Sequence, residues 1–418
     1  MHVADVELGE PLSLLFKPEQ PAAHKTAARL IVRLHGHPLG MVDVLPDELT
    51  ATSVGATIWA QLKAPIQRHF ELWHKQTIDA LPEGGVGDKD SALCSWRAAM
   101  TQAIPQATIV INSCAASERL AQTVISALGQ DYPNPSVMVV DNRPATSGIE
   151  SFLSKRLGEE TRLQFVAAPI AGLGRARNAG LRASGTAIVA FTDDDVVLDP
   201  GWLGWLVAGF DAAEHVGCVT GLIVPLELET PAQLFMEEFS GLAKGFEQRI
   251  WDRDEHRLED PLYPYTVGLF GSGASAAFRR EVLLGIGGFD PHLGIGTPAI
   301  GGEDIDLYTR MVLAGHRIVY QPASLLRHLH RREMSSVDRQ IRGYGAGLTA
   351  MLTKHLLTDR TTRRAVLRRV PAGVRHALSP RSPKNARKPA EFTLRQSLLE
   401  WAGMAYGPIG YLRSLLAG

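Results

Sequence analysis

The stretch TAIVAFTDDDVVL, residues 186–198, joins an apolar run to three consecutive carboxylates. The run TAIVAF predicts a buried strand, and Asp193, Asp194 and Asp195 follow directly at its end. Neighbouring carboxylates repel one another, and a divalent cation relieves this repulsion most simply. Oxygen ligands favour Mg²⁺ or Mn²⁺ over zinc, and Mg²⁺ keeps part of its coordination sphere for substrate phosphates. The stretch therefore predicts a metal site that binds a diphosphate-bearing ligand; a solvated loop is the alternative interpretation.

Around this stretch, residues 106–333 alternate short apolar strands with helical patterns. The expected strands are ATIVIN, SVMVVDN, LQFVAAP and TAIVAF, and the helices between them include ERLAQTVISALGQ and LGRARNAGLRAS. This alternation is typical of βαβ units, so we predict an α/β fold with a mostly parallel sheet flanked by helices. Ligands bind beyond the carboxyl ends of such strands, which is where VVDN places Asp141 and AFTDDD places the three aspartates.

A second group of carboxylates follows a glycine-rich stretch that runs from Gly285 to Gly302. Glu303 and Asp304 come directly after it, ahead of the helical pattern DLYTRMVLAG. The helix dipole favours acids at this position, so a capping role is one interpretation. The other is a general base beside a substrate pocket, because proton removal requires a positioned carboxylate. His328, after the strand-like run IVYQPASLLR, is a candidate metal ligand, with an ordinary surface or core histidine as the alternative.

The composition is that of an ordinary globular protein, with 45% hydrophobic and 21% charged residues in a chain of 418. The three cysteines, Cys94, Cys114 and Cys218, are widely spaced and give neither a disulfide framework nor a zinc-binding spacing. No stretch approaches the ~20 apolar residues that span a bilayer, and the acidic start MHVADVELGE has no secretory apolar region. We therefore expect a cytoplasmic protein.

The first 105 residues form a separate unit ahead of the α/β pattern. ARLIVRLHGHPLGMVDVLP alternates apolar and polar residues around a Gly/Pro turn, which predicts two strands. A helical pattern over residues 51–76 follows, with an interruption expected at Pro65, and LPEGGVGDKDS, residues 81–91, is the expected linker. This unit carries no catalytic signature. We interpret it as a small α+β accessory domain that serves docking or oligomerisation.

Residues 334–418 are expected to form a basic helical extension, broken by the linker PRSPKNARKP. From Arg327 to Arg395 there are 17 Lys and Arg against 4 acidic residues, although the net charge of the whole chain is only -1. Such a block predicts an anionic partner. Together with the apolar end TLRQSLLEWAGMAYGPIGYLRSLLAG it suits an anionic membrane surface, which would make the protein peripheral on the inner face of the cell membrane. The alternative is a solvated appendage that packs on the α/β domain.

Four motifs occur in order between residues 107 and 333. They are VVDNRP, GLGRARNAGL with TAIVAFTDDDV, GSGASAAFRREVLLGIGGFD, and GGEDIDLYTRMVLAGHRIVYQPASLLRH. Their combination resembles the inverting family-2 glycosyltransferases, which have a GT-A fold. The resemblance implies transfer of a sugar from a nucleoside diphosphate sugar, with a UDP-sugar as the first expectation, to an acceptor hydroxyl. It also implies Mn²⁺ or Mg²⁺ as cofactor, and it allows a lipid-linked or cell-envelope glycan or glycolipid as acceptor.

The resemblance further implies roles for individual residues. Asp304 corresponds to the catalytic base, and Glu303 supports it. The implied metal ligands are Asp195, Asp193 and His328, with His330 as a substitute for that histidine. The implied nucleotide-sugar-binding residues are Asp141, Arg177, Asn178, Asp193, Asp194 and Gly273. The first strand ends in INSCAASERL, which departs from the family pattern, so the contacts at Asn112 and Ser113 and the identity of the nucleotide stay open.

Three other functions fit parts of the sequence. A catalytically inactive GT-A-like binding scaffold would be expected to lose an acid from the aspartate cluster or from Glu303-Asp304, and both are intact. A sugar nucleotidyltransferase would have a glycine-rich phosphate loop where this chain has INSCAASERL. A nucleic-acid binder is suggested by the basic tail alone, which lacks interleaved aromatic residues, so no nucleic-acid partner is expected.

Overall fold

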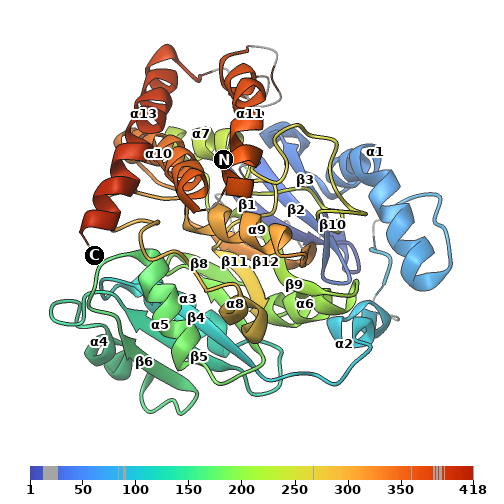
Figure 1. Cartoon of the computed structure of the whole chain (residues 1–418). Helices are drawn as coiled ribbons and strands as arrows, with labels where there is room; N and C mark the ends of the chain where they lie inside the picture. Colours follow the sequence, from blue (N-terminus) through green and yellow to red (C-terminus); the bar gives the residue numbers. More distant parts are fainter. Residues whose placement is uncertain are drawn as a thin grey trace.

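The computed structural model describes residues 1–12, 27–82, 84–87, 91–266, 268–358, 360–379, 382, 385, 388–389 and 391–417. Part of the expected linker at 81–91 and most of the one at 380–389 therefore lie outside the described residues. Figure 1 shows a central sheet with helices on both faces, a smaller N-terminal sheet beside it, and C-terminal helices along one side. These parts confirm the predicted fold class.

The N-terminal part contains a small sheet, one long helix and several short turns of helix. Its elements are β1 (His2–Glu7), β2 (Ala28–Leu34), β3 (His37–Val44), η3 (Pro46–Glu48), α1 (Ala51–His69), η4 (Phe70–His74), η5 (Ser91–Cys94) and α2 (Trp96–Ala99). The two strands predicted from the sequence are β2 and β3. The expected interruption at Pro65 is wrong, because α1 continues through it. Pro65 is only partly buried, so water can reach the carbonyl that loses its hydrogen bond to the proline nitrogen.

The central part alternates strands and helices as predicted. Its first half consists of β4 (Ala107–Ser113), α3 (Glu118–Leu128), β5 (Ser136–Asp141), α4 (Ile149–Leu157), β6 (Leu163–Ala167), α5 (Leu173–Ala183), β7 (Ile188–Thr192) and β8 (Val196–Leu198). Its second half consists of α6 (Trp202–Ala208), η6 (Gly209–Asp211), β9 (Val216–Pro225), α7 (Pro231–Ser240), β10 (Arg249–Trp251), β11 (Ser275–Arg279), α8 (Arg280–Gly285), α9 (Glu303–Leu313) and β12 (Arg317–His328). The C-terminal helices are α10 (Met334–Thr358), α11 (Arg360–Leu378) and α13 (Leu394–Leu416).

The strand order of the central sheet creates a crevice next to β4. The order is β10-β12-β9-β11-β7-β4-β5-β6, with β8 paired to β12. Strands β4, β5, β6 and β7 are mutually parallel, and β11 is antiparallel to both β7 and β9, so β9 and its parallel neighbour β12 run with the first four. The chain leaves β4 toward β5 on one side and returns to β7 on the other. Such a reversal of strand order is where open α/β sheets bind ligands.

Alternating side chains of the core strands bury two separate faces of the sheet. In β4, Ile109 and Ile111 pack with α3 and α6 on one face, whereas Val110 packs with α5 and α9 on the other. This period of two follows from the pleat of the strand, and because both faces are covered, the strand is apolar at nearly every position. The helices on the two faces hold the carboxyl ends of β4, β5 and β7 in fixed positions around the crevice.

The N-terminal sheet docks on the central domain within the same chain. Arg33 Nη1 lies 2.6 Å from a carboxylate oxygen of Asp199, and Arg327 pairs with Asp5. Strand β1, which the sequence analysis did not predict, lies beside β2 in parallel. The N-terminal part therefore packs on the central domain of its own chain, and its expected role in docking or oligomerisation stays a prediction.

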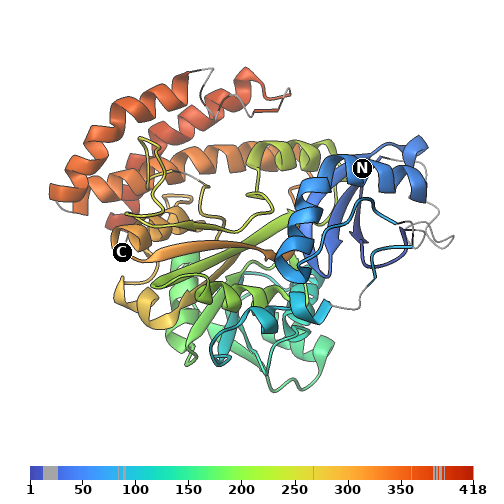
Figure 2. The ribbon, with the colours of Figure 1, turned by 90° about the vertical axis from the view of Figure 1, so that its right-hand side faces the viewer.

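The C-terminal helices pack on the central domain through small residues and buried ion pairs. On α10, Gly345 faces the backbone of Glu400 in α13, where a Cβ atom would meet the carbonyl oxygen at 2.2 Å. Lys354 Nζ of α10 lies 2.7 Å from a carboxylate oxygen of Asp306, a fully buried residue of α9. Helix α10 is thereby fixed to the helix that follows the glycine-rich stretch, and α11 and α13 lie at the outer edge of the molecule (Figure 2). Among the described residues, no helix is both long and apolar enough to cross a membrane.

Candidate active site

The three aspartates lie in the turn that follows β7, at the carboxyl edge of the sheet. On the neighbouring strand β4, the hydroxyl of Ser113 donates a hydrogen bond to the carboxylate of Asp194. Ser113 is in turn the register partner of Asp141, the last residue of β5. The ends of β4, β5 and β7 thus bring together the acids that the sequence places far apart, as the parallel-sheet prediction requires.

His328 joins two of these aspartates from the end of β12. Its Nε2 atom lies 3.4 Å from Oδ1 of Asp195, and one ligand atom each from Asp193, Asp195 and His328 lie within 4.8 Å of one another. His330, the expected substitute, instead has its Nε2 atom 2.8 Å from the carboxylate of Glu237 and is buried. Two carboxylates and one imidazole fit an octahedral Mn²⁺ or Mg²⁺ ion that keeps positions for water and phosphate oxygens.

The electrostatics of this cluster show that negative charge is incompletely balanced within the protein. Burial raises the pKa of Asp195 to about 6, and the neighbouring charge of Asp193 adds to the shift. Burial likewise raises the pKa of Asp194 to about 6, although the hydrogen bond from Ser113 opposes the shift. Burial lowers the pKa of His328, so its imidazole stays neutral and able to donate a lone pair to a metal. A bound cation would favour the ionised form of the aspartates and the neutral form of His328, which are the forms that bind a metal.

Arg177 connects the aspartate cluster to Glu303. Its guanidinium lies 3.3 Å from a carboxylate oxygen of Asp193 and 3.3 Å from one of Glu303, and it also donates to the carbonyl oxygen of Gly273 at 3.2 Å. Arg177 is only 2% exposed. Burial alone would lower the pKa of Arg177, but the two carboxylates outweigh that effect and raise it. Arg177 is therefore a buried cation that fixes the positions of Asp193 and Glu303 relative to each other.

Glu303 and Asp304 occupy different environments although they are adjacent. Glu303 is buried against Arg177, and burial together with the charge of Asp304 raises the pKa of its carboxyl group. Asp304 is partly exposed, and its two oxygens accept backbone N–H groups from Gly273 at 3.2 Å and Ile305 at 2.8 Å. Of the two carboxylates, only that of Asp304 reaches solvent. Its orientation is fixed by the two N–H groups, and each of its oxygens keeps a further lone pair. Asp304 is therefore the one of the pair that can meet a substrate hydroxyl.

Two glycines allow the close approaches on which this arrangement depends. A Cβ atom on Gly273 would lie 2.6 Å from Nη1 of Arg177. Gly302, just before α9, has a φ of 93°, and a Cβ atom there would meet the carbonyl oxygen of Gly347 in α10 at 2.5 Å. Helix α10, which the sequence analysis assigned to the tail, thus packs directly on the loop that carries Glu303 and Asp304.

Two other predicted nucleotide-sugar-binding residues, Asp141 at the end of β5 and Asn178 in α5, already form hydrogen bonds within the protein. Asp141 accepts from the backbone N–H of Arg143 at 2.8 Å and from the hydroxyl of Ser147. The amide of Asn178 donates to the carbonyl oxygen of Phe289 at 2.7 Å and accepts from the N–H of the same residue at 2.9 Å. Asn178 therefore positions the loop that precedes Gly294, and its role toward a nucleotide stays a prediction.

Two more residues belong to this region: Arg331, which was not among the predicted site residues, and Asn112, whose contacts the sequence left open. Arg331 places Nη1 3.8 Å from Asp195 and is half exposed, so a mobile cation faces the aspartate cluster. Asn112, near the end of β4, has both amide atoms buried without a hydrogen-bond partner among the described residues. The dense basic run RHLHRR was the signal for Arg331. No pattern distinguished Asn112, because its lack of a partner is a property of the packed structure alone.

Comparisons with known proteins show the family of this chain. A family model described as Glycosyltransferase like family 2 matches residues 105–346. The pre-mycofactocin glycosyltransferase of Mycobacterium tuberculosis is 32% identical over 185 residues, which are 44% of this chain and 36% of that protein. The glucosyl-dolichyl phosphate glucuronosyltransferase of Haloferax volcanii is 26% identical over 221 residues, 50% of this chain and 64% of that protein. The chain thus spans less than two thirds of the length of either relative.

Among solved structures, a mannosyltransferase from Pyrobaculum calidifontis in complex with GDP-Man and Mn²⁺ aligns with a TM-score of 0.48 and 18% identity, over 88% of this chain and 99% of that one.

Proposed function

This chain belongs to glycosyltransferase family 2, and from that membership we propose that it transfers a sugar from a nucleoside diphosphate sugar to an acceptor hydroxyl, with inversion at the anomeric carbon. One observation carries the proposal. Arg177 joins Asp193 of the aspartate cluster to Glu303, and Gly273 joins Arg177 to Asp304. The groups that would bind a diphosphate and the group that would activate a hydroxyl therefore belong to one rigid constellation.

Asp304 acts as the general base in this proposal. Its partly exposed carboxylate takes the proton of the acceptor hydroxyl while the acceptor oxygen forms a bond to the anomeric carbon. The bond between that carbon and the diphosphate oxygen breaks in the same displacement, and the electron pair leaves with the nucleoside diphosphate. Because attack and departure occur on opposite faces of the sugar, a single displacement inverts the anomeric carbon. Glu303 and Arg177 are positioning residues, since their ion pair fixes the neighbour of Asp304 and Arg177 also holds Gly273, whose N–H binds the Asp304 carboxylate.

Asp193, Asp195 and His328 would hold Mn²⁺ or Mg²⁺ in this site. When bound, the ion offsets the negative charge that develops on the leaving diphosphate. Arg331 lies at the exposed side of the same cluster, where its guanidinium can bind a phosphate oxygen. Asp141 and Asp194, at the ends of β5 and β7, are assigned to the nucleoside, with a UDP-sugar as the first donor to test. Gly273 is assigned to the donor sugar, and its lack of a side chain leaves room for the guanidinium of Arg177.

A lipid-linked acceptor is favoured by the C-terminal helices. The outward face of α13 is apolar, with Leu398 53%, Ile409 56% and Leu412 47% exposed, while glycines on its other face pack on α10. Helix α11, which packs on α10 as α13 does, carries six arginines and exposes Leu367 by 53%. Apolar side chains next to a dense positive charge complement an anionic lipid surface. We assign α11 and α13 to such a surface, which would bring a lipid-linked acceptor to the enzyme.

Vesicle binding tests this assignment. We expect the chain to float with vesicles that contain anionic phospholipid and not with neutral vesicles, and we expect Leu398→Glu combined with Leu412→Glu to abolish flotation. Ile125→Glu on α3, an exposed apolar residue far from α13 in the chain, is the matched control and should float normally. Equal binding to neutral vesicles, or none to either kind, would contradict the membrane role.

Donor turnover tests the enzymatic proposal itself. The purified chain is incubated with Mn²⁺ and a panel of UDP-, GDP- and dTDP-sugars, and release of the nucleoside diphosphate is followed with and without extracted membrane lipids. We expect release with one nucleotide class, and NMR of the product should give the anomeric configuration opposite to that of the donor. Binding of a donor without any release would instead identify an inactive binding scaffold.

A further inference from the structure

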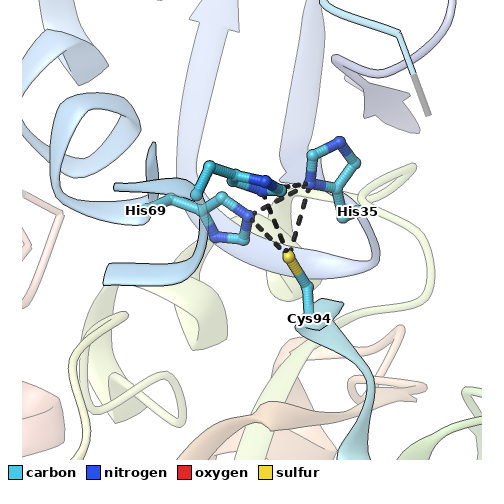
Figure 3. A group of neighbouring side chains, drawn as sticks. His35, His69 and Cys94 are labelled. Atoms are coloured by element: carbon cyan, nitrogen blue, oxygen red, sulfur yellow. Dashed lines mark hydrogen bonds between the residues drawn. The ribbon is translucent and has the colours of Figure 1, made fainter. Parts of the chain in front are cut away.

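Four metal-ligating side chains meet in the N-terminal part, far from the candidate active site. His35 lies in the turn between β2 and β3, His69 ends α1, His74 ends η4, and Cys94 ends η5. One ligand atom from each lies within 4.8 Å of the other three. Figure 3 shows His35, His69 and Cys94 with their side chains pointing toward one another. The four residues come from different elements, so the fold itself assembles the group.

The distances within this group match those of a tetrahedral zinc site. Nδ1 of His35 lies 3.2 Å from Nε2 of His69 and 3.2 Å from Nε2 of His74. The sulfur of Cys94 lies 3.4 Å from Nε2 of His69, 3.4 Å from Nε2 of His74 and 3.6 Å from Nδ1 of His35. With zinc bonds of about 2.0–2.1 Å to nitrogen and about 2.3 Å to sulfur, tetrahedral geometry requires about 3.3 Å between nitrogens and about 3.6 Å between nitrogen and sulfur.

Hydrogen bonds alone do not account for this convergence. Nδ1 of His35 faces three heteroatoms at once, and a neutral imidazole nitrogen carries one hydrogen or one lone pair in the ring plane. The other ring nitrogen of His35 lies 3.0 Å from the carbonyl oxygen of Gly87, which fixes the proton on Nε2 and leaves the lone pair on Nδ1. His37 approaches the carbonyl oxygen of Cys94 with Nε2 at 2.6 Å and so holds the backbone of that ligand.

The turn that carries His35 is built to hold its strained conformation. His35 and Gly36 have φ values of 52° and 80°, as the tight two-residue turn of a hairpin demands. The carboxylate of Glu7 accepts the backbone N–H groups of both residues, at 2.8 Å and 2.9 Å. A non-glycine residue in this conformation costs free energy, and the two hydrogen bonds to Glu7 offset part of that cost.

We propose that His35, His69, His74 and Cys94 bind a structural zinc ion. A thiolate with three imidazoles suits zinc, whereas Mn²⁺ and Mg²⁺ prefer the oxygen ligands of the aspartate cluster. On binding, the Cys94 thiol gives its proton to solvent, and all four tetrahedral positions are filled by the protein. His69 is 4% and Cys94 1% exposed, whereas His35 and His74 are partly exposed. Because the protein supplies all four ligands, no coordination position is left for a substrate, as in structural zinc sites.

The ion would lock the N-terminal part onto the central domain. Cys94 is followed by Trp96, which is buried in the core of the central domain against α6, where a Cβ atom on Gly204 would meet the indole at 2.4 Å. His37 packs its ring on Trp205 of the same helix, with ring centroids 4.7 Å apart. The zinc site therefore ties the β2–β3 turn and the end of α1 to the segment that enters the core.

Metal analysis of the full chain tests this proposal independently of any transferase activity. The chain is purified without chelator and dialysed against metal-free buffer, and zinc is measured by plasma mass spectrometry. We expect about one zinc ion per chain in the wild type and in the controls Cys114→Ser and Asp195→Ala, because neither control residue belongs to the group. Cys94→Ser and His69→Ala should each lose most of the zinc. Equal zinc in wild type and Cys94→Ser would overturn the proposal.

A cobalt spectrum keeps the test decisive if those variants fail to fold. Zinc is removed from the wild type with a chelator, and Co²⁺ is added back to wild type and to Cys114→Ser. We expect a thiolate-to-cobalt charge-transfer band and the intense visible bands of tetrahedral Co²⁺ in both proteins, and displacement of both by one equivalent of Zn²⁺. Binding of Co²⁺ with only weak octahedral bands, or no binding of either ion, would refute a Cys-ligated site.

Discussion

Two groups of side chains in this protein offer ligands to a metal ion, and they differ in position, chemistry and access. Asp193, Asp195 and His328 stand at the carboxyl edge of the central sheet, where the Asp193 side chain is 33% exposed. The second group, in the N-terminal part, closes a sulfur and three imidazoles around one point, and Cys94 is 1% exposed. The first leaves coordination positions open, whereas the second fills a tetrahedron.

This difference shows how one chain can separate a site that exchanges ligands from one that retains its ion. Oxygen ligands at an open edge suit a hard cation that arrives and leaves with a diphosphate. Sulfur and nitrogen ligands in a closed site suit a borderline cation that stays for the life of the fold. The contrast predicts that changes at one site leave the ion at the other in place.

The largest expected effect comes from removal of the base. In Asp304→Asn the side chain keeps its shape and an acceptor oxygen for Gly273, but the amide cannot take a proton. We expect sugar transfer to fall by about 10³-fold or more, while donor affinity and zinc content stay at wild-type values. Steady-state kinetics, calorimetry with the donor and metal analysis measure the three quantities. Turnover within tenfold of the wild type would disprove the assignment of Asp304.

Next in size is the loss of the buried cation that joins the acidic groups. Arg177→Met leaves Glu303 buried without its ion-pair partner, so we expect the free energy of unfolding to fall by about 3–5 kcal/mol. Arg97→Met is the matched control, because Arg97 pairs with Asp131 at the surface and should cost less than about 1 kcal/mol. Urea denaturation of both variants gives the comparison. Similar losses for the two variants would show that Arg177 has no special place in the site.

The three consecutive aspartates should differ in metal affinity. Asp195→Ala removes a ligand and should weaken Mn²⁺ binding at least about 100-fold. Asp194→Asn changes a residue that accepts from Ser113 and lies outside the ligand cluster, so it should weaken Mn²⁺ binding less than Asp195→Ala does. Calorimetric titration with Mn²⁺ distinguishes the two. If Asp194→Asn is the more damaging change, the ligand set is wrong.

As the pH falls, Mn²⁺ should leave the aspartate cluster before zinc leaves the N-terminal group. The pKa of Asp195, raised by burial to about 6, means that protons compete with Mn²⁺ below that pH, at a cost of up to about tenfold in affinity for each pH unit. In the N-terminal part, burial lowers the pKa of His37 to about 4 from 6.5, so its imidazole stays neutral at pH 5 in the folded protein.

The unfolded chain binds a proton at His37 below pH 6.5, so the stability contributed by neutral His37 declines as pH falls from 6.5 toward 4. At pH 5 we therefore expect weakened Mn²⁺ binding, retained zinc and reduced thermal stability. Calorimetry, metal analysis and thermal unfolding at pH 5 and pH 7.5 measure these changes. Mn²⁺ affinity that does not depend on pH in this range would argue against Asp195 as a ligand.

The smallest expected effect concerns the exposed arginine at the open site. Arg331→Ala removes a cation from the edge of the aspartate cluster, and we expect the KM for the donor to rise about fivefold with kcat nearly unchanged. Arg332→Ala is the control, because Arg332 pairs with Glu227 and Glu229 and should leave both constants unaltered. Equal kinetics for the two variants would remove Arg331 from the binding site.

Hydrophobic periodicity predicted strands β4 to β7 and β12 and helices α3, α5 and α9, but strands β8 to β11 were not predicted. The apolar runs that became β4, β5 and β7 are buried, whereas the edge strand β6 is only partly buried, and burial is what a continuous apolar run encodes. Parallel pairing then placed Asp141 and the three aspartates at one edge. Periodicity failed for β1, whose partner β2 begins 26 residues further along the chain, and for the effect of Pro65, which the helix tolerates at a partly exposed position.

The group of His35, His69, His74 and Cys94 could not be predicted from the sequence, because its members are far apart along the chain. Its members are separated by 33, 4 and 19 residues, and no local motif joins such intervals. The spacing of the three cysteines does not indicate a zinc site, because only one of them, Cys94, contributes to this group.

The sequence alone determined the kind of chemistry available to this protein: an α/β sheet with acids at its carboxyl edge and a basic, partly apolar tail. Tertiary structure decided which of those acids share a buried arginine, which carboxylate of the pair Glu303 and Asp304 reaches solvent, and that four distant N-terminal residues converge on one point. The physical reason is the distance along the chain over which each feature is set. Hydrophobic periodicity and the position of a residue at a strand end depend on neighbouring residues and can be read from the sequence. Burial, charge pairing and ligand geometry depend on contacts that form only when distant segments pack together.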